Sequence, residues 1–303
     1  MFARLADRFV LMPSRNAIRA EHKSRRIVRA EGRDIEVWIE RTDGRAPATI
    51  IPSVTGQPVL SPPANGNGQA AIPLPEPQIF ILKFNGAGGR AERTSIHPLD
   101  FWSDLPGEIW SPNPPGYGAS EGKPSLTWLA PTGRAVWEEL LQVAGTRPIV
   151  LTGNSLGTTV ALHLAARYAT AANLAGVILR NPPPLRQLIA GKFGWRTLGL
   201  SLGVARQIPR DLDSAANAAL ARVPCVLLCS GRDRIVPPRF QQLIVQNYAG
   251  LKQVVTIPAA DHVFELSEPD LAAYAEALTW LRANSPLLSR YGSNRLAAGI
   301  RGD

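Results

Sequence analysis

The chain has 303 residues, of which 45% are hydrophobic, so it is long enough for one large α/β domain or for two small ones. No apolar run approaches the roughly 20 residues that a membrane-spanning helix needs, and the N-terminus lacks the apolar core of a signal peptide, so we expect a soluble, cytoplasmic protein. The formal net charge of +9 is unevenly distributed along the chain.

The N-terminal arm, residues 1–24, is strongly basic. The acidic residues among the first 33 positions are Asp7, Glu21 and Glu31, and arginine and lysine outnumber them. Such an arm predicts a solvated surface segment, with weak contact to an anionic membrane surface as the alternative. No aromatic stacking pattern accompanies the charge, so no nucleic-acid partner is expected.

A β-hairpin is predicted next. Arg25–Ala30 and Ile35–Arg41 alternate polar and apolar residues on either side of a turn at positions 31–34. Residues 44–77 are then rich in proline and glycine and show little periodicity. They predict a long loop or flap, which a compact domain rarely carries without a function.

From residue 79 onwards, short apolar runs alternate with segments of helical spacing. The predicted strands are Ile79–Phe84, Glu108–Ser111, Pro148–Thr152, Leu174–Leu179, Val223–Ser230 and Gln253–Ile257. The predicted helices are Ala91–Leu105, Leu126–Ala144, Leu156–Ala172, Pro237–Ala249 and Glu268–Ala283. Strands that regularly alternate with helices indicate an α/β fold, with a mostly parallel central sheet covered by helices on both faces.

Residues 182–220 interrupt this alternation, because they read as helices and turns without a strand. We expect them to form a small helical cap above the sheet, within a single domain over residues 1–303. The basic, glycine-containing tail, residues 284–303, is expected to fray. Cys225 and Cys229 lie on one predicted strand about 13 Å apart, too far for a disulfide, so we expect packed thiols in a reducing compartment.

The pattern Gly-x-Ser-x-Gly, a candidate for a nucleophilic serine, occurs three times. The matches are Gly118–Gly122, Gly153–Gly157 and Gly199–Gly203. The pattern has mechanical meaning only where a strand turns sharply into a helix, because that nucleophile elbow exposes the serine hydroxyl at the end of the strand. Only Ser155 directly follows a buried strand and precedes a helical run, whereas Ser120 lies in a Pro/Gly loop and Ser201 in the cap.

A serine hydroxyl needs a base, and the base needs an orienting acid. Asp233 and His262 each come just past a predicted strand end, in the chain order Ser, Asp, His that this strand–turn–helix arrangement uses. Asp261 is the rival acid, but its direct adjacency to His262 makes a hydrogen bond to that ring awkward. We therefore predict a catalytic triad of Ser155, Asp233 and His262.

Acyl transfer also needs hydrogen-bond donors for the oxyanion of the transition state. The backbone N–H of Leu156, at the start of the nucleophile helix, is one candidate. The Gly-rich segment at residues 85–89 follows the Ile79–Phe84 strand, and we assign the second donor to the Ala87 N–H. A simple turn that only reverses the chain is the alternative.

Several motifs together resemble the α/β-hydrolase superfamily, and more closely its serine aminopeptidase-like and esterase-lipase-like branch. They are Asn85-Gly-Ala-Gly-Gly89, Pro115–Ser125, Gly153–Gly157, Gly231–Asp233 with Val236–Pro237, and Asp261–His262. They stand in the family's order over residues 79–283. The resemblance implies an α/β-hydrolase fold and a Ser–Asp–His triad, and it leaves the substrate open. The family usually has His-Gly where this chain has Asn85-Gly86, a change that a backbone donor is expected to survive.

Hydrolysis of a carboxylic ester through an acyl-enzyme is the leading functional hypothesis, with a thioester or an amide as other small-molecule substrates. A serine-dependent haloperoxidase or acyltransferase on the same scaffold is an alternative, because fold does not separate these reactions. A non-catalytic, basic binding protein at a membrane surface is another. No metal-ligand cluster and no phosphate-binding loop occurs in the sequence, so neither a metal nor another cofactor is expected.

The cap, residues 182–220, carries more large apolar residues than a small surface excursion needs. We predict that it walls an apolar acyl pocket, with Phe193 and Trp195 as substrate-binding residues.

Overall fold

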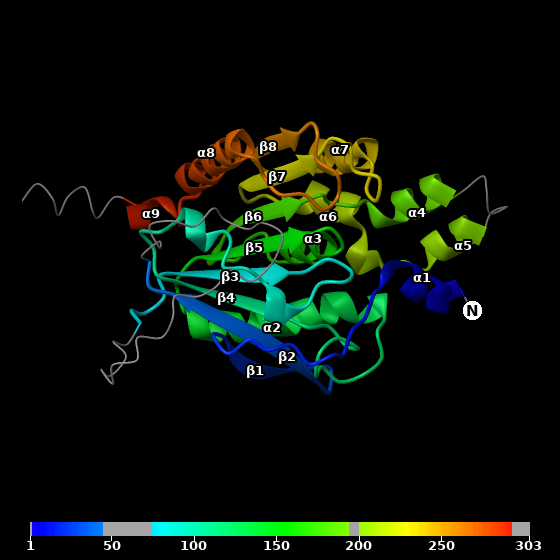
Figure 1. Ribbon diagram of the computed structural model, residues 1–303, viewed down its shortest axis with the longest axis horizontal. Helices are drawn as coiled ribbons and strands as arrows, with labels where there is room; N and C mark the ends of the chain where they lie inside the picture. Colours follow the sequence, from blue (N-terminus) through cyan, green and yellow to red (C-terminus); the bar gives the residue numbers. More distant parts are fainter. Residues whose placement is uncertain (1, 45–73, 194–199, 293–303) are drawn as a thin grey trace, which may run out of the picture.

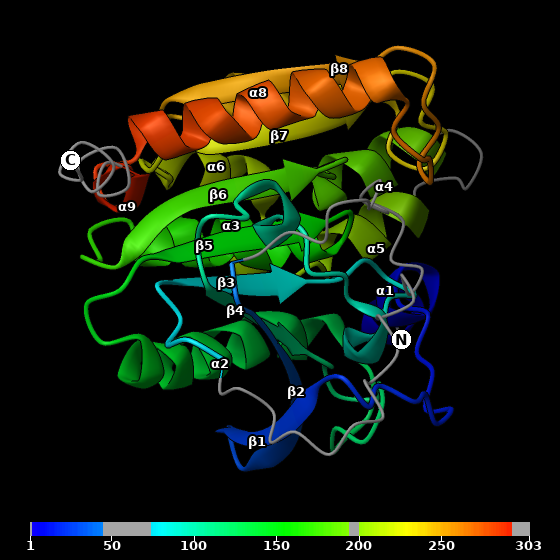
Figure 2. The same cartoon turned by 60° about the vertical axis from the view of Figure 1, so that its left-hand side comes forward.

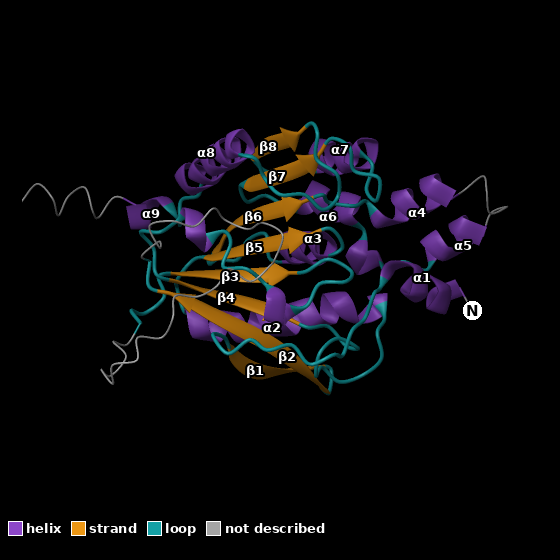
Figure 3. Ribbon diagram, in the orientation of Figure 1, coloured by secondary structure: helices purple, strands orange, loops and turns teal. Residues whose placement is uncertain are grey.

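An eight-stranded sheet forms the centre of the computed structural model, which describes residues 2–44, 74–193 and 200–292 (Figures 1 and 3). The strands are β1 (Ser24–Ala30), β2 (Arg33–Thr42), β3 (Ile79–Phe84), β4 (Gly107–Pro112), β5 (Ile149–Asn154), β6 (Leu174–Arg180), β7 (Cys225–Ser230) and β8 (Lys252–Ile257). Their order across the sheet is β1-β2-β4-β3-β5-β6-β7-β8. The pairs β1/β2 and β2/β4 are antiparallel, and the other pairs are parallel. The prediction of a mostly parallel sheet is therefore confirmed.

Helices cover both faces of this sheet (Figure 2). The helices are α1 (Phe2–Val10), α2 (Leu129–Ala144), α3 (Gly157–Arg167), α4 (Leu185–Phe193), α5 (Leu200–Arg206), α6 (Ser214–Leu220), α7 (Pro238–Asn247), α8 (Glu268–Asn284) and α9 (Ser289–Gly292). One core contains side chains of α2, α3, α6 and α7, and the other contains side chains of α8. None of the helices in the described ranges is long and apolar enough to cross a membrane.

Strands β3, β6 and β7 are largely apolar because their side chains alternate between the two cores. In β3, Phe80, Leu82 and Phe84 enter the core with α2 and α3, whereas Ile79 and Ile81 enter the core with α8. In β7 the same alternation buries Cys225 and Cys229 as free thiols among leucine and valine side chains.

The predicted helix Ala91–Leu105 is wrong. The segment forms two short 3₁₀ turns, η1 (Ala91–Arg93) and η2 (Leu99–Phe101). The ammonium of Lys83 donates to the backbone carbonyls of Ser95 and His97, which a continuous helix would use internally. His97 also precedes Pro98, and a residue before proline is disfavoured in the α conformation.

The N-terminal segment contains a helix, α1, where the sequence predicts only a basic arm. Phe2, Leu5, Ala6, Phe9 and Val10 recur at helical spacing, and this amphipathic pattern could have revealed it. Ala6 is buried in the core and α1 contacts α5, so this part of the arm packs on the protein instead of extending into solvent. At the other end, residues 284–292 of the predicted tail pack through the buried Leu288.

Within the described ranges, three helices lie beyond the carboxyl ends of the parallel strands. Both views show α1, α4 and α5 on this side (Figures 1 and 2). Helices α4 and α5 contact each other, whereas α6, also within the predicted cap, packs against α3 beside the sheet. The side chain of Phe193, the whole of Trp195 and most of the 44–77 loop lie outside the described residues.

The order of the central strands identifies where a site is expected. The next strand in sequence after β3, which is β4, lies on one side of β3 in the sheet. Strands β5 and β6 lie on the other side, so the connections run in opposite directions from the β3/β5 pair. In open α/β sheets such a divergence leaves a crevice at the carboxyl ends of the strands. Ser155 follows β5, and residues 85–89 follow β3, at this place.

Candidate active site

Ser155 occupies a sharp turn between β5 and α3. Its backbone φ is 50°, a left-handed conformation that is uncommon outside glycine. The two glycines of the motif are required by close packing. A Cβ on Gly153 would lie 2.6 Å from Thr158 Cα, and a Cβ on Gly157 would lie 2.1 Å from the Phe84 carbonyl oxygen. The turn therefore holds Ser155 half-buried at the carboxyl edge of the sheet.

Ser155, His262 and Asp233 form a continuous hydrogen-bonded chain. The Oγ of Ser155 is 3.0 Å from Nε2 of His262. The Nδ1 of the same ring is 2.7 Å from Oδ2 of Asp233. The carboxylate can only accept, so Nδ1 carries the proton and Nε2 is free to accept from the serine hydroxyl. The structure thus brings together the three residues that the sequence predicts as a triad.

The Asp233 carboxylate is buried and held on both oxygens. Its Oδ1 accepts from the backbone N–H groups of Ile235 and Val236, each at 2.8 Å. Its Oδ2 faces His262 and the side-chain amide of Gln241, whose Nε2 is 3.3 Å away. These contacts fix the carboxylate plane, which in turn fixes the plane of the imidazole.

Asp261 does not share this environment. Its carboxylate is exposed, and it accepts from the backbone N–H of His262 at 2.7 Å and of Arg234 at 3.4 Å. These backbone hydrogen bonds, that of His262 first, lower the pKa of Asp261. Asp261 thus braces the loop that carries His262, and these hydrogen bonds do not involve the ring.

The other two serines of the repeated pattern have structural surroundings. Ser120 is fully buried, donates to the Asn113 carbonyl at 2.6 Å and accepts from the Glu36 N–H at 2.9 Å. Ser201 is buried within α5. Neither stands at a strand-to-helix turn.

Two other histidines are also accounted for by packing. The Nε2 of His97 is 2.7 Å from the Tyr274 hydroxyl, and its Nδ1 is 3.2 Å from the Asp100 carboxylate. His163 on α3 is 3.2 Å from Arg134. Burial lowers the pKa of both rings. In the described part of the chain, His, Cys, Asp and Glu side chains form no cluster of three or more that would suit a metal ion.

The loop after β3, residues 85–89, lies against the nucleophile. A Cβ on Gly86 would stand 3.4 Å from the Cβ of Ser155. The Gly86 carbonyl accepts from the Gly89 N–H at 2.9 Å. Because C=O and N–H of a trans peptide point in opposite directions, this bond turns the Ala87 N–H away from the loop interior. Among the described residues, neither the Ala87 N–H nor the Leu156 N–H is used in a hydrogen bond.

Tyr117 and the N-terminal segment fix the position of the 85–89 loop through the Ala87 carbonyl. The Tyr117 hydroxyl donates to the Ala87 carbonyl at 2.6 Å. The backbone N–H of Met12 donates to the same carbonyl at 3.2 Å and to the Tyr117 oxygen at 3.1 Å. Burial raises the pKa of Tyr117 to about 12, so the hydroxyl keeps its proton as donor.

The end of β6 anchors the loop that carries His262. Asn181 is fully buried with a backbone φ of 49°. Its side-chain oxygen accepts from the Ser230 N–H at 3.0 Å, and its side-chain nitrogen donates to the His262 carbonyl at 3.1 Å. Next to it, the buried Arg180 donates to the Phe264 carbonyl at 3.0 Å and stacks on that ring. Neither anchor is predicted from the sequence, because a polar pair at a strand end carries no motif.

Two curated relatives share part of the sequence. The uncharacterized protein Rv2307c of Mycobacterium tuberculosis is 30% identical over 159 residues, 52% of this chain and 52% of that protein. The Homo sapiens alpha/beta hydrolase domain-containing protein 17B is 42% identical over 76 residues, 24% of this chain and 25% of that protein. The matched part of this chain thus spans about half the length of the first relative and about a quarter of the second.

Solved structures resemble the fold over most of its length. The Pyrococcus furiosus esterase Pf2001 superimposes with a TM-score of 0.59 at 11% identity, covering 91% of this chain and 97% of that chain. Est1E of Butyrivibrio proteoclasticus, solved with ferulic acid, gives 0.58 at 15% identity, covering 84% and 98%. Identities this low show the fold alone. The sequence profile of the alpha/beta hydrolase family, however, matches residues 84–276, which include the turn at Ser155 and both loops after β7 and β8. The chain therefore belongs to the alpha/beta hydrolase family.

Proposed function

We propose that this hydrolase cleaves a carboxylic ester, or a related thioester or amide, through an acyl-enzyme on Ser155. The observation that carries the proposal is the hydrogen-bonded chain from Ser155 Oγ through His262 to Asp233, at 3.0 Å and 2.7 Å. This is the arrangement that converts a weakly nucleophilic hydroxyl into an attacking group.

The reaction follows from the positions of the hydrogen-bonding groups. Ser155 Oγ attacks the acyl carbon while its proton passes to His262 Nε2. Asp233 stabilises the resulting imidazolium through Nδ1–H, and the N–H groups of Ala87 and Leu156 stabilise the oxyanion. His262 then returns the proton to the leaving group. Water repeats the sequence on the acyl-enzyme, which releases the carboxylic acid and restores the serine.

A fluorophosphonate probe tests the nucleophile directly. The probe phosphonylates a serine only where a base activates it, so we expect one labelled peptide, containing Ser155, in a digest analysed by mass spectrometry. Pretreatment with the probe should abolish hydrolysis of p-nitrophenyl acetate. Labelling of Ser120 or Ser201 in place of Ser155, or no labelling at all, would contradict the proposal.

Asn181 is proposed as a positioning residue for His262, and its role is separable from folding. Asn181→Gly removes both side-chain hydrogen bonds but relieves the left-handed backbone, for which glycine is suited. We expect kcat to fall by about 10- to 100-fold, because small misplacement of a catalytic group is costly, while KM stays nearly constant. The melting temperature should fall moderately, because the buried Ser230 N–H loses its acceptor, and the relieved backbone should offset part of that cost.

Asn181→Asp separates the two bonds, since it keeps an acceptor for the Ser230 N–H and loses the donor to the His262 carbonyl. A similar loss of kcat in both variants identifies the bond to His262 as the one that matters. Asn217→Ala is the matched control, because Asn217, in α6, is a buried asparagine whose side chain donates to the Asp211 carbonyl. Equal kcat in all four proteins would contradict the positioning role.

A further inference from the structure

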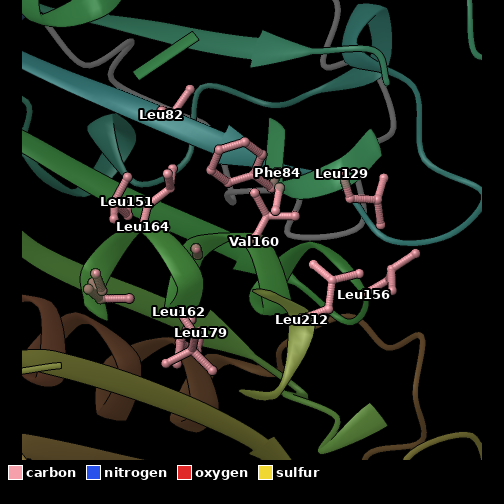
Figure 4. Close-up of a cluster of buried hydrophobic side chains, with 14 of the residues drawn as sticks. Leu82, Phe84, Leu129, Leu151, Leu156, Val160, Leu162, Leu164, Leu179 and Leu212 are labelled. Carbon is pink, nitrogen blue, oxygen red and sulfur yellow. The ribbon is translucent and has the colours of Figure 1, made fainter. Parts of the chain in front are cut away.

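A small cavity lies beside the loop of residues 85–89. Its volume is about 40 Å³, and it is bounded by that loop, the first turns of α2 and α3, and the N-terminal segment. Most of its wall is apolar, and Leu11 lines it together with Phe84, Leu129, Leu156 and Val160. The last four of these side chains are labelled in Figure 4. A cavity with such walls favours hydrocarbon over ordered water.

The N-terminal segment supplies one wall of this cavity through Leu11, which lies outside the family match at residues 84–276. The segment is held on both sides of Leu11. The Asp7 carboxylate accepts from the Leu126 N–H at 2.8 Å, and the Met12 N–H donates to the Ala87 carbonyl. Leu11 is buried, so this wall is a fixed part of the described structure.

The cavity adjoins the place where the acyl group of a substrate is attached. Gly86 and Leu156, which line it, are the neighbours in sequence of Ala87 and Ser155. In the sheet, the cavity lies on the β3 and β4 side of β5, whereas His262 approaches Ser155 from the β8 side. His262 must face the leaving group to protonate it. In a bound ester, the leaving group therefore points toward His262 and the acyl group points toward the cavity.

We propose that this cavity is the acyl subsite, and that Leu11 makes the enzyme selective for short aliphatic acyl groups. The proposal rests on the proposed function, since it assigns a substrate class to the same site. A group the size of a water molecule or a methylene needs about 10–15 Å³ of cavity volume. The cavity of about 40 Å³ therefore accommodates an acyl group of about three to four carbons. The predicted contacts with Phe193 and Trp195 of the cap involve side chains outside the described residues and stay a prediction.

The test is kcat/KM for p-nitrophenyl esters from acetate to octanoate. In the wild type we expect a rise of up to about fourfold per methylene until the cavity is full, then a fall beyond butyrate. Leu11→Ala should move the optimum to longer chains, and Leu11→Phe should move it to shorter ones. Val160→Ala enlarges the cavity from its α3 wall and should also move the optimum to longer chains. Val136→Ala is its matched control, a buried valine of the same core that does not line the cavity.

The outcomes distinguish the subsite from the underlying activity. If the Leu11 and Val160 variants keep the wild-type chain-length profile while Ser155→Ala abolishes turnover, the cavity is not the acyl subsite and the hydrolase proposal stands. A flat chain-length profile in the wild type would overturn the subsite in the same way. If the wild type hydrolyses no ester and Ser155 is not labelled by a fluorophosphonate, the proposed function itself is wrong.

Discussion

Replacing Ser155 with alanine is expected to lower kcat for ester hydrolysis by about 10³-fold or more. In the proposed mechanism, the variant loses the atom that forms the acyl-enzyme, while the N–H groups of Ala87 and Leu156 and the binding of substrate remain. The remaining activity is therefore limited to direct attack of water on the bound ester, and KM should change little. The measurement is steady-state hydrolysis of p-nitrophenyl butyrate, with fluorophosphonate labelling of the same preparations.

The fold should be unaffected by this change. Ser155 already has a left-handed backbone with a Cβ, and alanine keeps both. The main-chain bonds of the turn, from the Ser155 N–H to the Arg180 carbonyl and from the Thr158 N–H to the Ser155 carbonyl, do not involve the hydroxyl. We expect a melting temperature within about 2 °C of the wild type.

Two further serines provide controls for the Ser155 variant. Ser201→Ala should retain most activity. Ser120→Ala should also retain activity but lose stability, since it removes a buried hydroxyl that donates to the Asn113 carbonyl and accepts from the Glu36 N–H. Equal activity and equal labelling of Ser155→Ala and the wild type would show that Ser155 is not the nucleophile.

The central sheet could be predicted because the apolar pattern of each strand is visible within its own short segment of sequence. A strand buried on both faces must be apolar at nearly every position, and β3, β6 and β7 are such runs. The segment Ala91–Leu105 could not be predicted correctly because its conformation depends on distant partners. Lys83 binds two of its carbonyls, and Asn113 accepts from the Ala91 N–H. Helical spacing in a sequence carries no record of such contacts.

The meeting of Ser155, Asp233 and His262 could be predicted because each follows a recognisable strand, and their order along the chain is informative. The groups that hold them could not. Tyr117 reaches the Ala87 carbonyl across 30 positions, and Asn181 reaches the His262 carbonyl across 81. Met12 contributes only a backbone N–H, so its side chain gives no indication of the role. Positioning contacts of this kind become visible only once the strands are placed side by side.

Asp233→Asn is expected to lower kcat by about 10²- to 10⁴-fold, because the substitution changes the tautomer of His262. The position of Asp233 Oδ1 is held by the N–H groups of Ile235 and Val236, so the amide oxygen of an asparagine must occupy it. The amide nitrogen then stands where Oδ2 stood, facing His262 Nδ1. A donor there makes Nδ1 the acceptor, and the ring proton moves to Nε2, which can no longer take the proton of Ser155.

Asp261→Asn is the matched comparison, since it makes the same chemical change beside the same histidine. Asparagine keeps an acceptor for the backbone N–H groups of His262 and Arg234, and the side chain is exposed, so kcat should fall by less than about threefold. Both variants are to be assayed with the same ester over the same pH range. If Asp261→Asn proves the more damaging of the two, then Asp261 is the orienting acid, and the contact of Asp233 with the ring does not serve catalysis.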